Sequence, residues 1–227
     1  YDESANISKV VNHLKCESSF IETSSENFLT NLEKIISYYQ SPVPTVSYYI
    51  HNQLIKKIKE SGFSVAISGT GADEIFTGYY DHYNFWLQMM TSEPNFEKLR
   101  DEWKKGYGRK VNNPLIKNIT QFIENQNYRE HLYQNSKDFN KILIDKIDVK
   151  FEEIKYSSDN LRNRMINELN HEIVPTILYS DDLNSMMHSI ENRSPFLDKE
   201  LVEFISSVDS SFLIKNGLAK FILRESM

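Results

Sequence analysis

Cysteine is almost absent from this chain, since Cys16 is the only one among 227 residues. One thiol excludes a disulfide framework and a cysteine-based zinc site built within the chain. Long apolar runs are also missing, because none approaches the ~20 residues that a membrane-spanning helix needs. Residues 1–4 do not resemble a signal peptide. We therefore expect neither membrane insertion nor export, and a reducing cytoplasm suits the single cysteine.

A surplus of basic residues is lacking as well. The chain has 26 lysines and arginines against 32 acidic residues, which gives a formal net charge of -6. Nucleic-acid surfaces normally carry a basic excess, so we expect no nucleic-acid partner. The histidines show no metal-like spacing, and each is expected to be a surface or a hydrogen-bonded core residue: His13, His51, His82, His131, His171 and His188.

Internal repeats and low-complexity tracts are absent too. With 40% hydrophobic residues and a mean hydropathy of -0.51, the chain suits one large globular domain or two small ones. Its first residue is not methionine, and a helical pattern is still running at Met227. We therefore interpret the chain as a fragment.

The first 62 residues are expected to form three helices and a short strand. Ser4 is a candidate N-cap for the first helix, and Ser24 opens the second. Two prolines within residues 41–45 end the second helix, because proline disfavours helix in the residue before it. A third amphipathic helix follows and stops at Gly62, and Phe20–Ile21 is the candidate strand.

A glycine-rich turn follows a short apolar strand at residues 63–67. The turn is Ser68-Gly69-Thr70-Gly71-Ala72-Asp73-Glu74, and a helix begins at its end. Such a turn aims bare backbone N–H groups and a positive helix end at one point, which favours a bound anion. The acidic pair would repel a phosphate unless a metal lay between them, so this turn predicts phosphate together with Mg²⁺.

The order of helix, glycine stop, buried strand, turn and helix is typical of an α/β layer with a parallel sheet. Ligands of such folds lie at the carboxyl ends of the strands, where Ser68 stands. Residues 90–170 are expected to be mainly helical, with loops at the glycines Gly106 and Gly108 and at residues 112–114. The aromatic residues before this stretch are expected to pack between layers: Tyr79, Tyr80, Tyr83, Phe85 and Trp86.

A second informative segment runs from Ser180 to Asp198, with dense polar residues on a helix expected to end before Pro195. An amphipathic helix follows at residues 201–205. Taken alone, Glu191, Arg193 and Asp198 are typical of salt bridges at helix ends, and Lys220 is typical of a solvated lysine.

Three motifs in this order resemble the synthetase domain of the asparagine synthetase family, which includes β-lactam synthetases and related amide-forming enzymes. The pattern SGxGxDE with a following Gly-Tyr matches residues 68–74 and 78–79. The pattern HxLExRxPFLD matches residues 188–198, and GxxKxxLR matches residues 217–224. The match covers residues 1–227, although it is loose at 90–170. We expect one partial domain, with a nucleotide-binding α/β part at about 1–90 and a mainly helical part at about 91–227.

The resemblance implies a PP-loop fold, which is a parallel sheet flanked by helices, and an ATP pyrophosphatase that uses ATP and Mg²⁺. A substrate carboxylate would be adenylated with release of pyrophosphate, and an amine donor would then displace AMP to form an amide. Ser68, Gly69 and Gly71 would donate hydrogen bonds to the phosphates. Asp73 would bind the metal, and Lys220 would be the cation at the phosphates.

Departures from the family pattern limit this assignment. The first phosphate loop, SGGxDS, is missing together with about one βαβ unit, roughly 30 residues, and so is the glutaminase domain, so the fragment alone is expected to be inactive. Thr70 stands where the family usually has an acidic residue that handles the protons of the amine, and threonine is no general base near neutral pH. Either Glu74 or a substrate carboxylate takes the proton, or the nucleophile is not ammonia. Leu183 stands where the family often has arginine, which favours an acyl substrate other than aspartate.

Lys220, Thr70 and Glu74 are thus the candidate catalytic residues. The expected partners are a small carboxylate and an amine donor, with ammonia from glutamine and a homodimer both left open. One alternative is a non-catalytic nucleotide-binding or interaction module derived from the same fold, since Thr70 and Leu183 depart from the pattern. Another PP-loop enzyme, such as a nucleic-acid thiolase, fits less well because the chain is acidic and carries the PFLD element.

Overall fold

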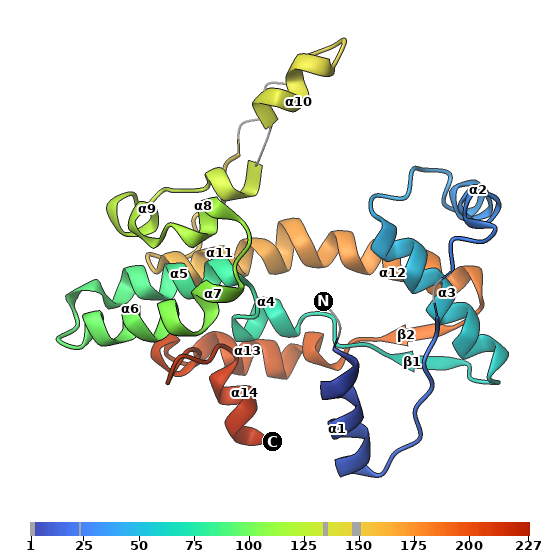
Figure 1. Ribbon diagram of the computed structural model, residues 1–227, viewed down its shortest axis with the longest axis horizontal. Coiled ribbons are helices and arrows are strands. Elements are labelled where there is room, and N and C mark those ends of the chain that lie inside the picture. The colour runs from blue at the N-terminus through green and yellow to red at the C-terminus, as the bar shows by residue number, and fades with distance from the viewer. Residues whose placement is uncertain (1–2, 23, 134–135, 147–150) are drawn as a thin grey trace. The chain divides into compact units, whose positions relative to one another are not determined.

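The computed structural model describes residues 3–22, 24–133, 136–146 and 151–227, and it is mainly helical (Figure 1). The chain divides into two compact units. The smaller unit contains residues 1–66 and 180–192, and the larger contains residues 67–179 and 193–227. Each unit therefore combines segments that are distant in the sequence.

The smaller unit is built from helices around a small aromatic and aliphatic core. Ile35, Tyr39 and Tyr49 are buried, and Leu183 packs against them. The phenol of Tyr39 donates to the backbone oxygen of Ser180 at 3.2 Å, which fixes α2 to the end of α12. The helices are α1 (Ser4–Leu14), α2 (Phe28–Tyr39), α3 (Val46–Glu60) and the end of α12 (Ile173–Met187).

Two expectations for the start of the chain are wrong. Phe20–Ile21 is not a strand, since the chain there has no regular structure. The second helix begins at Phe28 and not at the serines, because Ser24 accepts a hydrogen bond from the Glu26 N–H at 3.0 Å and so forms a turn. Asn27 then adopts a left-handed conformation at φ 56°, which a helix interior does not allow.

The sheet consists of two short parallel strands, β1 (Val65–Ile67) and β2 (Glu191–Arg193). The expected parallel sheet flanked by helices is therefore limited, in the part of the chain that the structure describes, to this pair. β1 is also not the buried strand that we expected, because Val65 is 44% and Ile67 76% exposed. Within the described residues β1 has one neighbouring strand, and these two side chains are open to solvent.

The helix that was expected to end before Pro195 does so, and its last residue is Met187. Ser189 adopts a left-handed φ of 55°, and the Ile190 N–H donates back to the Ser185 oxygen at 2.9 Å, which closes the helix end. The chain then enters β2, where the Glu191 N–H donates to the Ser64 oxygen at 2.9 Å. Glu191 and Arg193 therefore lie on a strand and not at a helix end.

The described residues between 90 and 170 are mainly helical and include no strand, as we expected, although residues 151–157 have no regular structure. Gly108 lies inside α7 and not in a loop. Glycine is favoured there by packing, because a Cβ would come within 2.9 Å of the Trp103 ring. Asn113 and Pro114 do mark a boundary, since Asn113 caps α8 and Pro114 is its first residue.

The helices of the larger unit before the π-helical segment are α4 (Ala72–Phe76), α5 (Tyr80–Met89), α6 (Phe96–Lys105), α7 (Tyr107–Lys110), α8 (Pro114–Lys117), α9 (Ile119–Glu124), α10 (Ser136–Ile142) and α11 (Asn160–Asn167). The π-helical segment Glu168–Glu172 then leads into α12. The last helices of the chain are α13 (Lys199–Ser207) and α14 (Phe221–Ser226).

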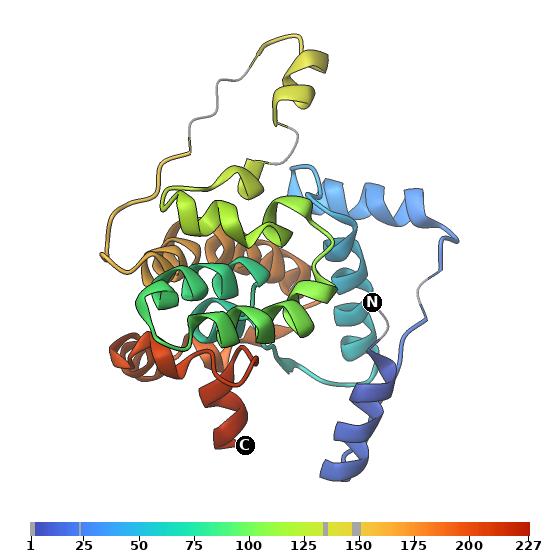
Figure 2. The same cartoon turned by 60° about the vertical axis from the view of Figure 1, so that its left-hand side comes forward.

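The core of the larger unit gathers around α5. Tyr83, Phe85, Trp86 and Leu87 are all buried, and α5 contacts α6, α9 and α11 (Figure 2). Phe85 meets Phe122 of α9 edge to face at 5.2 Å between ring centroids. The aromatic residues therefore pack as predicted, although they pack between helices and not between a sheet and a helical layer.

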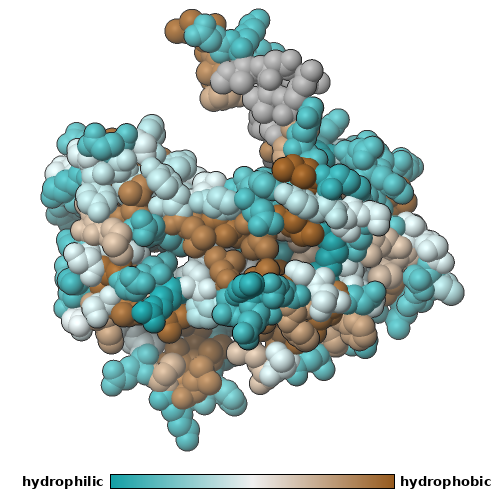
Figure 3. All heavy atoms as spheres, turned by 180° about the vertical axis from the view of Figure 1, so that it is seen from behind, coloured by the Kyte–Doolittle hydropathy of each residue, from teal (hydrophilic) through white to brown (hydrophobic). Residues whose placement is uncertain are grey.

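Some large apolar side chains remain on the surface, as the brown areas among the teal ones show on the face drawn in Figure 3. Ile7, Val10 and Leu14 of α1 are among the exposed ones, and α1 buries no residue. Across the described ranges no helix combines the length and the apolar character that a bilayer crossing requires.

Candidate functional site

The Ser68 turn joins β1 to α4, and hydrogen bonds attach it to the end of β2. The Ser68 N–H donates to the Arg193 oxygen at 2.8 Å. The Ser68 hydroxyl lies 3.0 Å from the Ser194 hydroxyl and 3.2 Å from the Thr70 hydroxyl. The first and second motifs of the sequence therefore meet at this turn.

Gly71 fits the turn for two independent reasons. Its φ of 95° lies in the left-handed region, which costs free energy for any residue with a Cβ. A Cβ at this position would also lie 2.4 Å from Cδ2 of Leu197 in the PFLD element. The same element packs again one turn of helix further on, where Phe196 meets Phe76 edge to face at 5.9 Å.

Gly69 differs from Gly71, although both belong to the same motif. No heavy atom of its surroundings lies within 4 Å of a Cβ built at Gly69, and its φ is not in the left-handed range. Packing therefore does not require glycine here. The backbone at Gly69 is open to the approach of a ligand.

Replacing each glycine with alanine separates these two situations. We expect Gly71→Ala to lower the free energy of unfolding by about 2–4 kcal/mol, since it adds both a left-handed penalty and a clash with Leu197. Gly69→Ala is expected to change it by less than about 1 kcal/mol, because surface changes that break no contact are small. Urea unfolding followed by circular dichroism measures both. Equal losses in the two variants would contradict the packing role of Gly71.

The carboxylate of Asp73 forms an ion pair with the ammonium group of Lys220. The Asp73 side chain is 44% exposed and that of Lys220 is 28% exposed, so both charges can reach a ligand. Gly78 leaves the space for this carboxylate, because a Cβ at Gly78 would lie 1.7 Å from Oδ1 of Asp73. The Gly-Tyr pair therefore needs glycine at its first position, because the Asp73 side chain occupies the space that a Cβ would fill.

Lys220 reaches Asp73 because a tight turn precedes it. Lys215 and Leu218 pair across this turn, and Gly217 occupies it with a φ of 73°. Lys220 itself is left-handed at φ 55° and is the N-cap residue of α14, while its N–H donates to the Thr77 hydroxyl at 3.4 Å. The third motif is thereby brought to the first, as the resemblance requires.

Glu74 follows Asp73 on α4 but lies in different surroundings. Successive side chains on a helix point about 100° apart, and Glu74 is only 2% exposed. The Tyr79 phenol donates to Oε1 of Glu74 at 2.6 Å. Burial and this hydrogen bond raise the pKa of Tyr79, so the phenol stays protonated and keeps donating. The Glu74 carboxylate is therefore buried and fixed by a hydrogen bond, whereas the neighbouring Asp73 carboxylate is exposed.

Two further residues of the segment from Ser180 to Asp198 have structural roles. Asp198 caps α13 by accepting the Leu201 N–H at 3.1 Å, so it acts at a helix start through a hydrogen bond. Leu183, which departs from the family arginine, packs against the small core formed by Ile35, Tyr39 and Tyr49.

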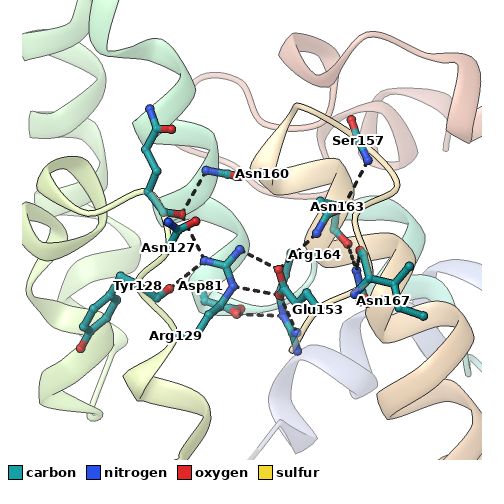
Figure 4. Close-up of polar contacts among 12 residues, drawn as sticks. Asp81, Asn127, Tyr128, Arg129, Glu153, Ser157, Asn160, Asn163, Arg164 and Asn167 are labelled. Atoms are coloured by element: carbon teal, nitrogen blue, oxygen red, sulfur yellow. Dashed lines mark hydrogen bonds and ion pairs between the residues drawn. The ribbon is translucent and has the colours of Figure 1, made fainter. Parts of the chain in front are cut away.

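A buried polar cluster of the larger unit centres on Arg164, and no sequence motif pointed to it. Arg164 is 1% exposed and donates to Glu168 at 2.9 Å and to Glu172 at 2.6 Å. Glu153 accepts from Arg164 at 3.1 Å and also from Arg129 at 2.7 Å, and Figure 4 shows both guanidinium groups reaching this carboxylate. The spacing of four and eight residues from Arg164 to the two helical glutamates is the one local signal that sequence offered.

Asp81, His82 and Glu168 lie close enough together to hold a metal ion, but Arg164 occupies their surroundings. Its Nε lies 2.9 Å from Glu168 and 3.8 Å from Asp81. Burial alone raises the pKa of Asp81, yet the hydrogen bond with His131 and the nearby positive charges lower it overall. Burial opposes a charge on His82, but Glu168 at 2.6 Å raises its pKa overall.

The acidic side chains of this cluster are therefore already neutralised by protein cations, and the cluster is structural. His82 and His131 are hydrogen-bonded core histidines, as predicted.

The fold and the turn together define a mainly helical α/β protein in which a glycine-rich turn, a PFLD element and a lysine turn are assembled. The chain belongs to the asparagine synthase family, whose profile matches residues 1–227. It is 24% identical over 241 residues to "Asparagine synthetase [glutamine-hydrolyzing] 1" of Bacillus subtilis (strain 168), with 97% of this chain and 35% of that protein covered.

A second relative is "Amidase chry2" of Gibberella zeae (strain ATCC MYA-4620 / CBS 123657 / FGSC 9075 / NRRL 31084 / PH-1). It is 23% identical over 268 residues, which cover 100% of this chain and 38% of that protein. The chain thus spans a little over a third of the length of these relatives. No solved structure matches it significantly.

Proposed function

We propose that the protein containing this chain forms amide bonds from a carboxylate and an amine with ATP, through an acyl-adenylate. The observation that carries the proposal is the Asp73–Lys220 ion pair beside the Ser68 turn. A metal-binding carboxylate, a cation and an open glycine backbone are the groups that a departing pyrophosphate needs. Membership of the asparagine synthase family supports the same chemistry.

In the first step, an oxygen of the substrate carboxylate attacks the α-phosphorus of ATP, and the bond to the β-phosphate oxygen breaks with loss of pyrophosphate. The Ser68 hydroxyl and the backbone N–H groups of Gly69 and Gly71 donate to the phosphate oxygens. Lys220 exchanges its partner Asp73 for these oxygens. Asp73 is an exposed oxygen ligand of the kind that Mg²⁺ prefers, and the ion would supply positive charge to the phosphates.

In the second step, the amine nitrogen attacks the acyl carbon, the bond to the AMP oxygen breaks, and the nitrogen loses a proton. Thr70 cannot accept this proton near neutral pH, because its hydroxyl is far too weak a base. Glu74 is the neighbouring carboxylate, and Tyr79 holds it in place. We therefore assign the proton to Glu74. The alternative that Thr70 leaves open is a nucleophile other than ammonia.

The test uses the full protein with ATP and Mg²⁺ and a panel of small carboxylic acids, first without and then with amines. We expect one class of acid to produce AMP and pyrophosphate, and to support exchange of labelled pyrophosphate into ATP. Glutamine as a source of ammonia is one amine arm, since the Bacillus relative is named for glutamine hydrolysis. ATP binding without any AMP from a broad panel would favour the non-catalytic module. A cytoplasmic location and a homodimer stay predictions.

A further inference from the structure

A cavity of about 220 Å³ lies against α4 within the larger unit. Glu74 and Ile75 of α4 form one part of its wall, and α11 contributes Arg162 and Met165. Ile205 of α13 lies on a further side. The cavity therefore adjoins the glycine-rich turn through the helix that this turn begins.

Most of the wall is apolar. Ile75, Met165 and Ile205 are 4%, 4% and 3% exposed, so the residues that shape the cavity belong to the packed core. Leu169 and Ile166 extend the same surface. Such a wall suits a short aliphatic group, because burying each methylene of a ligand contributes roughly 0.8 kcal/mol.

Glu74 gives this apolar cavity a negative group. Among the residues that the structure describes, Tyr79 is its hydrogen-bond partner, and it uses Oε1. The second oxygen, Oε2, is left to accept a hydrogen bond from a ligand. A buried carboxylate is costly unless it meets a cation or a donor, so the cavity favours a ligand that carries an ammonium group.

Arg162 does not cancel this preference. Its Nε donates to the Ser210 hydroxyl at 3.0 Å, and its NH2 group donates to the Val208 oxygen. Ser210 in turn donates to Asp159 at 2.7 Å. The guanidinium is thereby held by its own unit, and Asp159 balances its charge.

We propose that this cavity binds the amine substrate as a primary amine on a short aliphatic body, with its ammonium group against Glu74. The assignment rests on the proposed function and deepens it, because it names the chemical class of the nucleophile. It also agrees with the presence of Thr70 at the position in the turn where the family pattern has an acidic residue, since Glu74 would then supply the carboxylate for the amine.

The binding test uses the full protein without ATP, and isothermal titration with three probes of equal size. These are 3-methylbutylamine, 3-methylbutanol and 3-methylbutanoate. We expect the amine to bind at least about tenfold more tightly than the other two, since a hydrogen bond to a charged partner contributes roughly 1.5–3 kcal/mol. Glu74→Gln, which keeps an acceptor for Tyr79, is expected to lose this preference.

Two serines of α13 provide a matched pair that does not depend on changing a buried charge. Ser206 and Ser207 are both exposed, and both hydroxyls donate to carbonyl oxygens of α13 at 2.6 Å. Only Ser206 lines the cavity. We expect Ser206→Phe to weaken amine binding about tenfold or more by filling the cavity, and Ser207→Phe to leave it unchanged.

Equal binding of the three probes, tighter binding of the acid, or equal effects of the two phenylalanine variants would overturn the proposal. The proposed function is measured separately, through AMP and pyrophosphate release. Selective amine binding without AMP release would contradict the proposed ligase function and support the amine site. AMP release without selective amine binding would contradict the amine site and leave the proposed function standing.

Discussion

Replacing Lys220 with alanine is expected to lower the rate of AMP and pyrophosphate release by about 10²–10³-fold, the usual loss when one preorganised group at a developing charge is removed. Lys220 is the cation that the tight turn before α14 brings to Asp73. Without it, the negative charge that develops on pyrophosphate has no protein cation from this motif. The measurement is the steady-state rate in the full protein at saturating acid, ATP and Mg²⁺.

Two controls separate charge from folding in this experiment. Lys220→Arg keeps the charge and is expected to retain part of the activity. Lys215→Ala removes an exposed lysine from the same turn, where its ammonium group lies 5.4 Å from the centre of the Phe221 ring, and it is expected to keep the rate unchanged. Full activity of Lys220→Ala would show that the phosphate role of Lys220 is wrong.

Arg164→Met is expected to lower the free energy of unfolding by about 3–5 kcal/mol, the cost of removing one partner from a buried ion pair. The loss leaves the buried Glu168 without one of its positively charged partners, and it removes the ion pairs of Arg164 with Glu153 and Glu172. Methionine fills a similar volume, so the effect comes mainly from the uncompensated charges. Urea unfolding at neutral pH measures it.

Arg109→Met is the matched control for this substitution. Arg109 is exposed on α7, and no ion pair connects it to another part of the chain that the structure describes. We expect Arg109→Met to change the free energy of unfolding of the protein by less than about 0.5 kcal/mol, as at most surface positions. A similar loss in both variants would mean that the Arg164 cluster contributes no specific stability.

Local patterns predicted much of the fold and the motif positions. The apolar periodicity indicated α1 and α3, and the apolar run before the glycine-rich turn indicated β1, which ends at Ile67. The run at residues 112–114 indicated a loop, and residues 112–113 do lie in the connection before α8. These features depend on neighbours within a few residues, so the sequence carries their full physical cause.

Elsewhere the sequence was insufficient, because contacts with residues distant in the sequence decide the structure. Glu191–Arg193 have the composition of a helix end, but backbone pairing with β1 makes them a strand. The Arg164 cluster combines residues from four separate segments, and no spacing rule connects Asp81 to Glu153. Gly69 and Gly71 are equivalent in the motif, and only the structure distinguishes them, through the left-handed φ of Gly71 and its close approach to Leu197.

The sequence by itself determined the family motifs, the order in which they occur and the unusual threonine at position 70. These are facts of residue identity and short spacing, and they need no coordinates. Only the tertiary structure decided that Lys220 reaches Asp73, that Gly78 makes room for it, and that Glu74 borders an apolar cavity. Such contacts depend on where distant segments are packed, since a charge or a cavity wall acts over a few ångströms of space and not along the chain.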